Sequence, residues 1–150
     1  MLHESAEILL VEDDPAHAAV IERAVRARRP TATLRVVTSA REAIDYLMCD
    51  GAYVSRTRSS DPKLVMVDLE HSVPEGLEVV RRLKSSPRAK RIPIVFLTNR
   101  GAEEALELYG LGANSHIVKP EPGALEEAAR SITDYWLGLN EPPVYVPDPD

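Results

Sequence analysis

Five polar residues that could do chemistry together stand where short apolar runs of the sequence end. Glu12 and Asp13 close the first such run, Asp68 closes a second, Thr98 a third and Lys119 a fourth. In an open parallel sheet, ligands bind beyond the carboxyl ends of the strands. If the runs are parallel strands, three carboxylates, a hydroxyl and an ammonium converge at one edge of the sheet.

Carboxylates held close together repel one another, and each has a raised pKa unless a cation offsets the charge. Mg²⁺, or Mn²⁺ in its place, prefers oxygen ligands and needs only one or two carboxylates. Such a metal can neutralise an incoming phosphoryl group and leave one carboxylate as the nucleophile. Lys119 would then contact one phosphoryl oxygen, and Thr98 would form a hydrogen bond to another. The predicted chemistry is metal-assisted phosphoryl transfer.

The elements that must position these residues alternate between strand and helix. The predicted strands are the apolar runs at residues 8–11, 64–67 and 93–97, with further strand candidates at 34–37 and 116–118. Apolar residues at helical spacing lie between the runs and after the last one. This alternation favours an α/β fold with a parallel sheet, and right-handed crossovers make it a three-layer sandwich.

Helix boundaries follow from capping residues and from proline and glycine. Pro15 suits the first turn of a helix, Asp14 before it is expected to cap that helix or face solvent, and Thr38 or Ser39 can cap the next. We expect the helix at 102–109 to be closed by glycines. The last helix is predicted at 121–137.

Bulk composition limits the classes of function. The 150 residues suit one domain, and 18 basic against 24 acidic residues give a formal net charge of −6, so no nucleic-acid binding is expected. A single cysteine, Cys49, excludes an intrachain disulfide and fits a reducing compartment. Neither a signal peptide nor an apolar stretch of membrane-spanning length is visible. We therefore expect a cytoplasmic protein without membrane contact.

The sequence resembles the receiver domains of response regulators in two-component signalling. The matching segments are ILLVEDD at 8–14, LVMVDLE at 64–70, VFLTN at 95–99 and HIVKP at 116–120. The resemblance covers residues 7–137, which we take as one domain, and leaves a Pro-rich C-terminal arm at 138–150. It implies a doubly wound, flavodoxin-like fold: five parallel strands in the order 2-1-3-4-5, with helices on both faces.

The resemblance also implies a role for each acid of the site. Asp68 matches the phosphoacceptor and Asp13 the main metal ligand, while Glu12 matches a second acid that acts through water. The backbone carbonyl of Glu70 would complete the metal shell. Most receivers carry an uncharged residue at this position, so the Glu70 side chain is a possible modulator of the phosphoryl lifetime.

The resemblance implies that three residues contact the phosphoryl group or change conformation when it is present. Thr98 matches the switch hydroxyl, Lys119 matches the lysine of the family, and His116 takes the aromatic switch position that is commonly tyrosine. His3, His17 and His71 show no metal-ligand spacing, and we expect them at the surface.

A narrower resemblance is to the small stand-alone receivers that partner phytochrome-type histidine kinases. It rests on the long loop at 50–63, the segment 83–99 and the ending SITDYWLGLNEPPVY. Members of that group form homodimers and carry no output domain. The implied partners are a sensor histidine kinase, possibly of the phytochrome type, and a second copy of the chain.

Three hypotheses stay open on the sequence alone. The first is a single-domain response regulator, which is a signalling phosphoacceptor with limited self-phosphorylation and autodephosphorylation chemistry rather than an enzyme. The second is a degenerate receiver that acts as a phosphorylation-independent interaction module, supported by Glu70 and Ser72. The third is a metal-dependent phosphatase on a related sheet, with Glu70 as its second acid. Only 13 residues follow the last predicted helix, so we expect no DNA-binding helix-turn-helix domain.

Overall fold

The computed structural model describes most of the chain. The described residues are 6–57, 61–68, 73–98, 102–119 and 123–141, apart from the side chains of residues 73 and 102–105.

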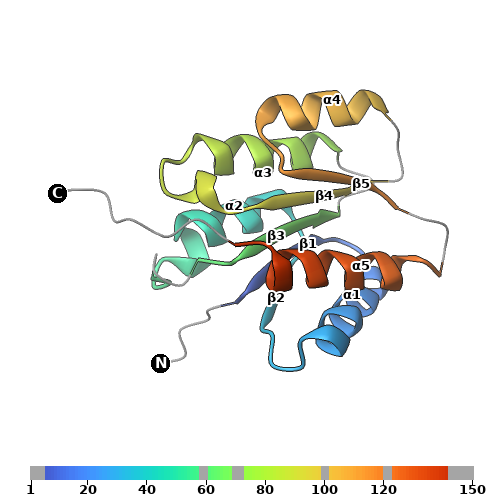
Figure 1. The fold of residues 1–150 in the computed structure, drawn as a ribbon. Coiled ribbons are helices and arrows are strands. Elements are labelled where there is room, and N and C mark those ends of the chain that lie inside the picture. Colours follow the sequence, from blue (N-terminus) through green and yellow to red (C-terminus); the bar gives the residue numbers. More distant parts are fainter. Residues whose placement is uncertain (1–5, 58–60, 69–72, 99–101, 120–122, 142–150) are drawn as a thin grey trace.

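A parallel five-stranded sheet forms the centre of the described part (Figure 1). Its strands are β1 Ile8–Glu12, β2 Leu34–Val37, β3 Leu64–Asp68, β4 Ile94–Thr98 and β5 Ser115–Val118. They are ordered β2-β1-β3-β4-β5, and every neighbouring pair is parallel. The predicted flavodoxin-like fold and its strand order are therefore confirmed.

Helices cover both faces of the sheet (Figure 1). They are α1 Pro15–Arg28, α2 Ala40–Met48, α3 Val73–Ser85, α4 Ala102–Leu111 and α5 Leu125–Thr133. Helices α1 and α5 pack side by side on one face, and α2, α3 and α4 lie on the other. The chain thus forms the predicted three-layer sandwich.

Each face of the sheet has its own hydrophobic core. In β1, Leu9 and Val11 belong to the core beneath α2 and α3, whereas Ile8 and Leu10 belong to the core beneath α1 and α5. All four side chains are fully buried. A strand covered on both faces is apolar at nearly every position, which is why the central strands β1, β3 and β4 appear as apolar runs in the sequence.

Capping residues start the first two helices as the sequence predicts. Asp14 caps α1, and its carboxylate accepts a hydrogen bond from the amide of Ala16 at 2.9 Å. Ser39 caps α2 by accepting from the amide of Glu42 at 3.1 Å. These caps fix the point at which α1 begins, directly after the end of β1.

Three helix boundaries differ from the sequence prediction. Helix α4 passes through Gly110 and ends at Leu111, because a helix tolerates an interior glycine at a cost of about 1 kcal/mol. The last helix begins at Leu125 rather than at residue 121, since Gly123 has a φ of +103°, which no right-handed helix contains. It then continues past residue 137 as a π-helical segment, Asp134–Leu139. Residues 142–150 of the predicted arm lie outside the described residues.

The loop between α2 and β3 is held by a buried arginine. Arg56 donates to the carbonyl oxygens of Tyr46 at 2.8 Å and Leu47 at 3.3 Å, and it pairs with Asp61 at 3.2 Å. Arg88 pairs with the same carboxylate. Two cations on one partly buried carboxylate fix this loop to the body of the domain.

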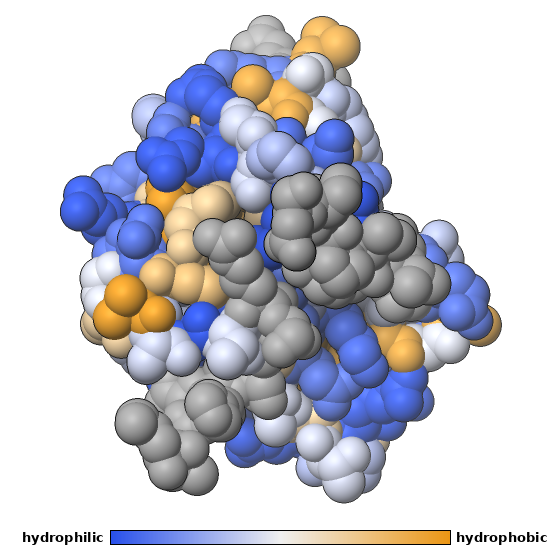
Figure 2. All heavy atoms as spheres, turned by 90° about the vertical axis from the view of Figure 1, so that its left-hand side faces the viewer, coloured by the Kyte–Doolittle hydropathy of each residue, from blue (hydrophilic) through white to orange (hydrophobic). Residues whose placement is uncertain are grey.

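The surface at the end of the molecule that faces left in Figure 1 is largely hydrophilic. Figure 2 shows this face, with apolar residues in small separate patches among polar ones. Within the ranges given above, no helix is long and apolar enough to cross a bilayer.

Candidate functional site

Two acids from neighbouring strands face each other at the carboxyl edge of the sheet. Glu12 ends β1, Asp68 ends β3, and the strand register pairs the two residues directly. Glu12 is 2% exposed and Asp68 is fully buried. The parallel register therefore brings together the first and second acidic segments predicted from the sequence.

The electrostatics of this pair favour a cation. Burial and the facing carboxylate of Asp68 raise the pKa of Glu12 to about 10. Glu12 Oε1 accepts a hydrogen bond from the amide of Asp14 at 3.1 Å. Within the described ranges, Oε2 of Glu12 has no hydrogen-bond partner, and the buried carboxylate of Asp68 is met by the Lys119 ammonium. Buried oxygens without donors are suited to a hard divalent ion, so this donor set fits Mg²⁺ or Mn²⁺.

Lys119 supplies a positive charge to the pair. Its Nζ lies 2.5 Å from Asp68 Oδ1, and its side chain is only 7% exposed. The backbone amide of Lys119 donates to the carbonyl of Thr98, which ties the end of β5 to the end of β4. The ammonium is thus held against the carboxylate that the sequence predicts as nucleophile.

Thr98 and His116 form a hydrogen-bonded pair across β4 and β5. Thr98 is 3% exposed, and its Oγ1 lies 2.7 Å from His116 Nε2. The backbone amide of His116 also donates to the hydroxyl of Tyr109 on α4, at 3.0 Å. A change at Thr98 can therefore reach α4 through His116.

The structure separates Asp13 from the buried acids. The side chain of Asp13 is exposed, and it is not part of the cluster formed by Glu12, His17 and Asp68. Its role as the main metal ligand stays a prediction. Glu70, predicted to contribute its carbonyl and a modulating side chain, lies outside the described residues.

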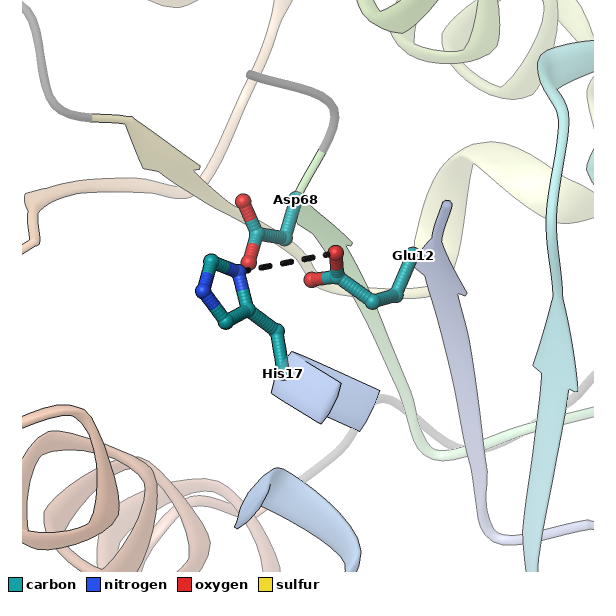
Figure 3. Close-up of side chains that lie close together, drawn as sticks. All are labelled: Glu12, His17 and Asp68. Carbon is teal, nitrogen blue, oxygen red and sulfur yellow. Dashed lines mark ion pairs between the residues drawn. The ribbon is translucent and has the colours of Figure 1, made fainter. Parts of the chain in front are cut away.

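His17 is partly exposed, as a surface position implies, but it also lies beside the two buried acids, which its sequence spacing did not predict. Its Nδ1 lies 3.9 Å from Glu12 Oε1 and 3.5 Å from Lys119 Nζ, and its side chain is 36% exposed (Figure 3). The sequence feature that could have predicted this is the position of His17 in the first turn of a helix that begins directly after the predicted site. Residues in such a turn lie close to the strand ends, and standard metal-ligand spacings do not reveal this.

Comparison with known proteins agrees with this fold. The chain matches the response regulator receiver domain over residues 8–130 and belongs to that family. One relative, the probable methanogenesis regulatory protein FilR2 of Methanothrix harundinacea, is 34% identical over 91% of this chain and 86% of its own length.

Solved structures of response regulators extend the comparison. The phosphorylated cyanobacterial phytochrome response regulator RcpA superposes with a TM-score of 0.83 at 30% identity, covering 91% of this chain and 97% of RcpA. The Mn²⁺-bound form of response regulator Rcp1 superposes with a TM-score of 0.76 at 29% identity, covering 91% and 98%. Stand-alone phytochrome response regulators are therefore among its structural neighbours.

Proposed function

We propose that the chain is a single-domain response regulator that accepts a phosphoryl group on Asp68 from a sensor histidine kinase in a Mg²⁺-dependent reaction. One observation carries this function: Asp68 is fully buried at the carboxyl end of β3, with the Lys119 ammonium 2.5 Å away and the Glu12 carboxyl group facing it. A buried carboxylate beside a cation and a second acid is suited to receive a phosphoryl group rather than only to cap a helix.

The transfer is a displacement at phosphorus. An oxygen of Asp68 attacks, an O–P bond forms, and the N–P bond to the kinase histidine breaks, so that the histidine nitrogen leaves with the bonding electrons. Lys119 shifts from the carboxylate to a phosphoryl oxygen and stabilises its charge. Mg²⁺ or Mn²⁺, when bound by Asp13, Asp68, the Glu70 carbonyl and, through water, Glu12, supplies further charge neutralisation. The Mn²⁺-bound structure of Rcp1 supports the choice of metal.

Phosphorylation is then read through Thr98. In the unphosphorylated protein the Thr98 hydroxyl is 2.7 Å from His116 Nε2. A phosphoryl oxygen on Asp68 competes for this hydroxyl, so His116 loses its partner and can reorient. Because Tyr109 contacts the His116 amide, the change passes to α4. The large apolar side chains exposed along α4 and β5 are Leu106, Tyr109 and Val118. This surface is the one we expect to change its affinity for partners.

The resemblance to RcpA and Rcp1 supports a place in a phytochrome-type light-signalling pathway. On the same basis we propose that the chain forms a homodimer. We also propose that it binds no nucleic acid, because its net charge is −6. The chain would act as a phosphoacceptor with limited self-phosphorylation and autodephosphorylation chemistry, rather than as an enzyme with a separate substrate.

The test is phosphorylation by acetyl phosphate, followed as intact mass. The native chain, Asp68→Asn and the matched control Asp50→Asn, which alters an exposed aspartate, are incubated with Mg²⁺ or with EDTA. We expect a mass gain of one phosphoryl group in the native chain and the control with Mg²⁺, and none in Asp68→Asn or in EDTA. A native chain that gains no mass and binds no beryllofluoride would instead be a degenerate receiver acting as an interaction module.

A further inference from the structure

The acidic edge of the sheet contains a nitrogen ligand in addition to its oxygens. One ligand atom each from Glu12, His17 and Asp68 lie within 4.8 Å of one another (Figure 3). Mg²⁺ binds imidazole weakly, because it prefers oxygen ligands in a nearly ideal octahedral arrangement. The cluster shares Glu12 and Asp68 with the Mg²⁺ site proposed above, but it adds His17, which that site does not use.

We propose that Glu12, His17 and Asp68 form a binding site for Zn²⁺, and that the zinc-bound chain cannot be phosphorylated. Imidazole binds Zn²⁺ and related late transition metals well, and carboxylates complete such sites. The inhibitory part of this inference rests on the proposed function, because it requires Asp68 to be the phosphoacceptor.

The distances suit a tetrahedral ion after small side-chain movements. Two ligands that each lie 2.0–2.1 Å from a tetrahedral zinc are about 3.3 Å apart. His17 Nδ1 and Glu12 Oε1 are 3.9 Å apart, so they must approach by about 0.6 Å. Every pair in the cluster is within 4.8 Å, a gap that side-chain rotation can close. The fourth position would be filled by water.

Two buried carboxyl groups that face each other point independently to a cation here. The side chain of Glu12 is 1% exposed and that of Asp68 is fully buried. Among the described residues, no hydrogen bond is formed to Glu12 Oε2, and Asp68 is met by the Lys119 ammonium, which lies 2.5 Å from its Oδ1. Leaving such oxygens without a donor or a cation is costly, and a divalent ion removes that cost.

The imidazole is also oriented for metal binding. Its Nδ1 is directed at the cluster, whereas its Nε2 lies 3.7 Å from Oδ2 of Asp14. Asp14 is itself fixed as the cap of α1. A carboxylate beside the outer nitrogen favours the proton on Nε2 and leaves the Nδ1 lone pair for the ion, which is the usual arrangement of zinc-binding histidines.

Zinc at this position would exclude phosphoryl transfer for two reasons. It would occupy the Asp68 carboxylate, which must attack phosphorus. It would also displace Lys119, whose Nζ lies 2.5 Å from Asp68 Oδ1 and 3.5 Å from His17 Nδ1, in the space that the ion would take. The zinc-bound chain would therefore lose both the nucleophile and the cation of the reaction.

The experiment compares Zn²⁺ and Mg²⁺ affinities of the full chain at pH 7.5 by competition with a chromophoric chelator. The variants are His17→Ala, His17→Gln and the matched control His3→Ala. We expect His17→Ala to lower the ratio of Zn²⁺ to Mg²⁺ affinity at least about tenfold, as loss of metal-site partners does. The control should leave this ratio unchanged. In the native chain Zn²⁺, but not Mg²⁺, should shift the NMR signal of His17 Nδ1.

Equal Zn²⁺ affinity in the native chain and both His17 variants would overturn the proposal, as would zinc binding that leaves the His17 signal unmoved. Circular dichroism of the variants separates loss of a ligand from loss of the fold. Labelling of the native chain by acetyl phosphate in Mg²⁺, with and without Zn²⁺, separates the two proposals. No labelling in Mg²⁺ alone counts against the phosphoacceptor function, whereas labelling that persists with Zn²⁺ bound refutes the inhibition.

Discussion

Replacing Glu12 with glutamine should stabilise the metal-free protein, and the gain should grow with pH. In the folded state, burial and the facing Asp68 carboxylate raise the pKa of Glu12 to about 10, from an ordinary value of 4.5. At neutral pH the folded chain therefore keeps a proton on Glu12 that the unfolded chain releases. Glutamine keeps the shape of the side chain but has no proton to gain or lose.

The sign and size of the effect follow from proton linkage. Between pH 4.5 and 10 the folded state binds more protons at Glu12 than the unfolded state, so the stability contributed by this group is present below pH 4.5 and is lost as pH rises. The loss is at most about 1.4 kcal/mol per pH unit. From pH 5.5 to 8.0, Glu12→Gln should gain up to about 3 kcal/mol in free energy of unfolding relative to the native chain.

Urea denaturation in EDTA at several pH values from 5.5 to 8.0 measures this difference. The matched control is Glu127→Gln, which alters an exposed glutamate on α5 and should show no such trend. Saturating Mg²⁺ should flatten the trend, because a cation between the carboxylates allows Glu12 to ionise. A stability difference between Glu12→Gln and the native chain that is constant across the pH range would refute the reasoning.

Three further substitutions test other buried charges, each by urea denaturation. Lys84→Met removes an ammonium that donates to two backbone carbonyls and a side-chain amide, at 2.9–3.2 Å, and should cost about 2 kcal/mol. Arg56→Met leaves Asp61 with one of its two arginine partners and should cost about 3 kcal/mol. Lys119→Met leaves Asp68 buried without its ammonium and should cost about 3 kcal/mol in EDTA, part of which Mg²⁺ restores.

Opposite results would identify which argument fails. An unchanged stability of Lys84→Met would mean that water replaces the lost donors. If Arg56→Met loses less than about 0.5 kcal/mol of stability, the buried Arg56–Asp61 ion pair stabilises the fold no more than a surface salt bridge does. If Mg²⁺ stabilises the native chain and Lys119→Met equally, the ion and the ammonium do not share the Asp68 carboxylate.

The sequence alone was sufficient for the fold and for the location of the site. The central strands β1, β3 and β4 contain continuous apolar runs because helices bury both of their faces. Parallel strands end at one edge, so Glu12, Asp68 and Thr98 had to lie near one another once the runs were recognised. The sequence determined the helix boundaries less well. Helix α5 begins after Gly123, which has a positive φ, and glycine can adopt either sign of φ, so the residue type alone did not predict this start.

Only the tertiary structure decided which side chains enter the site. Glu12 is the last residue of β1, is buried and faces Asp68, whereas Asp13, one residue later, is exposed and its role as a metal ligand stays a prediction. His17 reaches the same space from the first turn of α1, and His116 meets Thr98 across two strands. The order of residues fixes which segments form the strands and helices, but the direction of each side chain depends on how the elements pack.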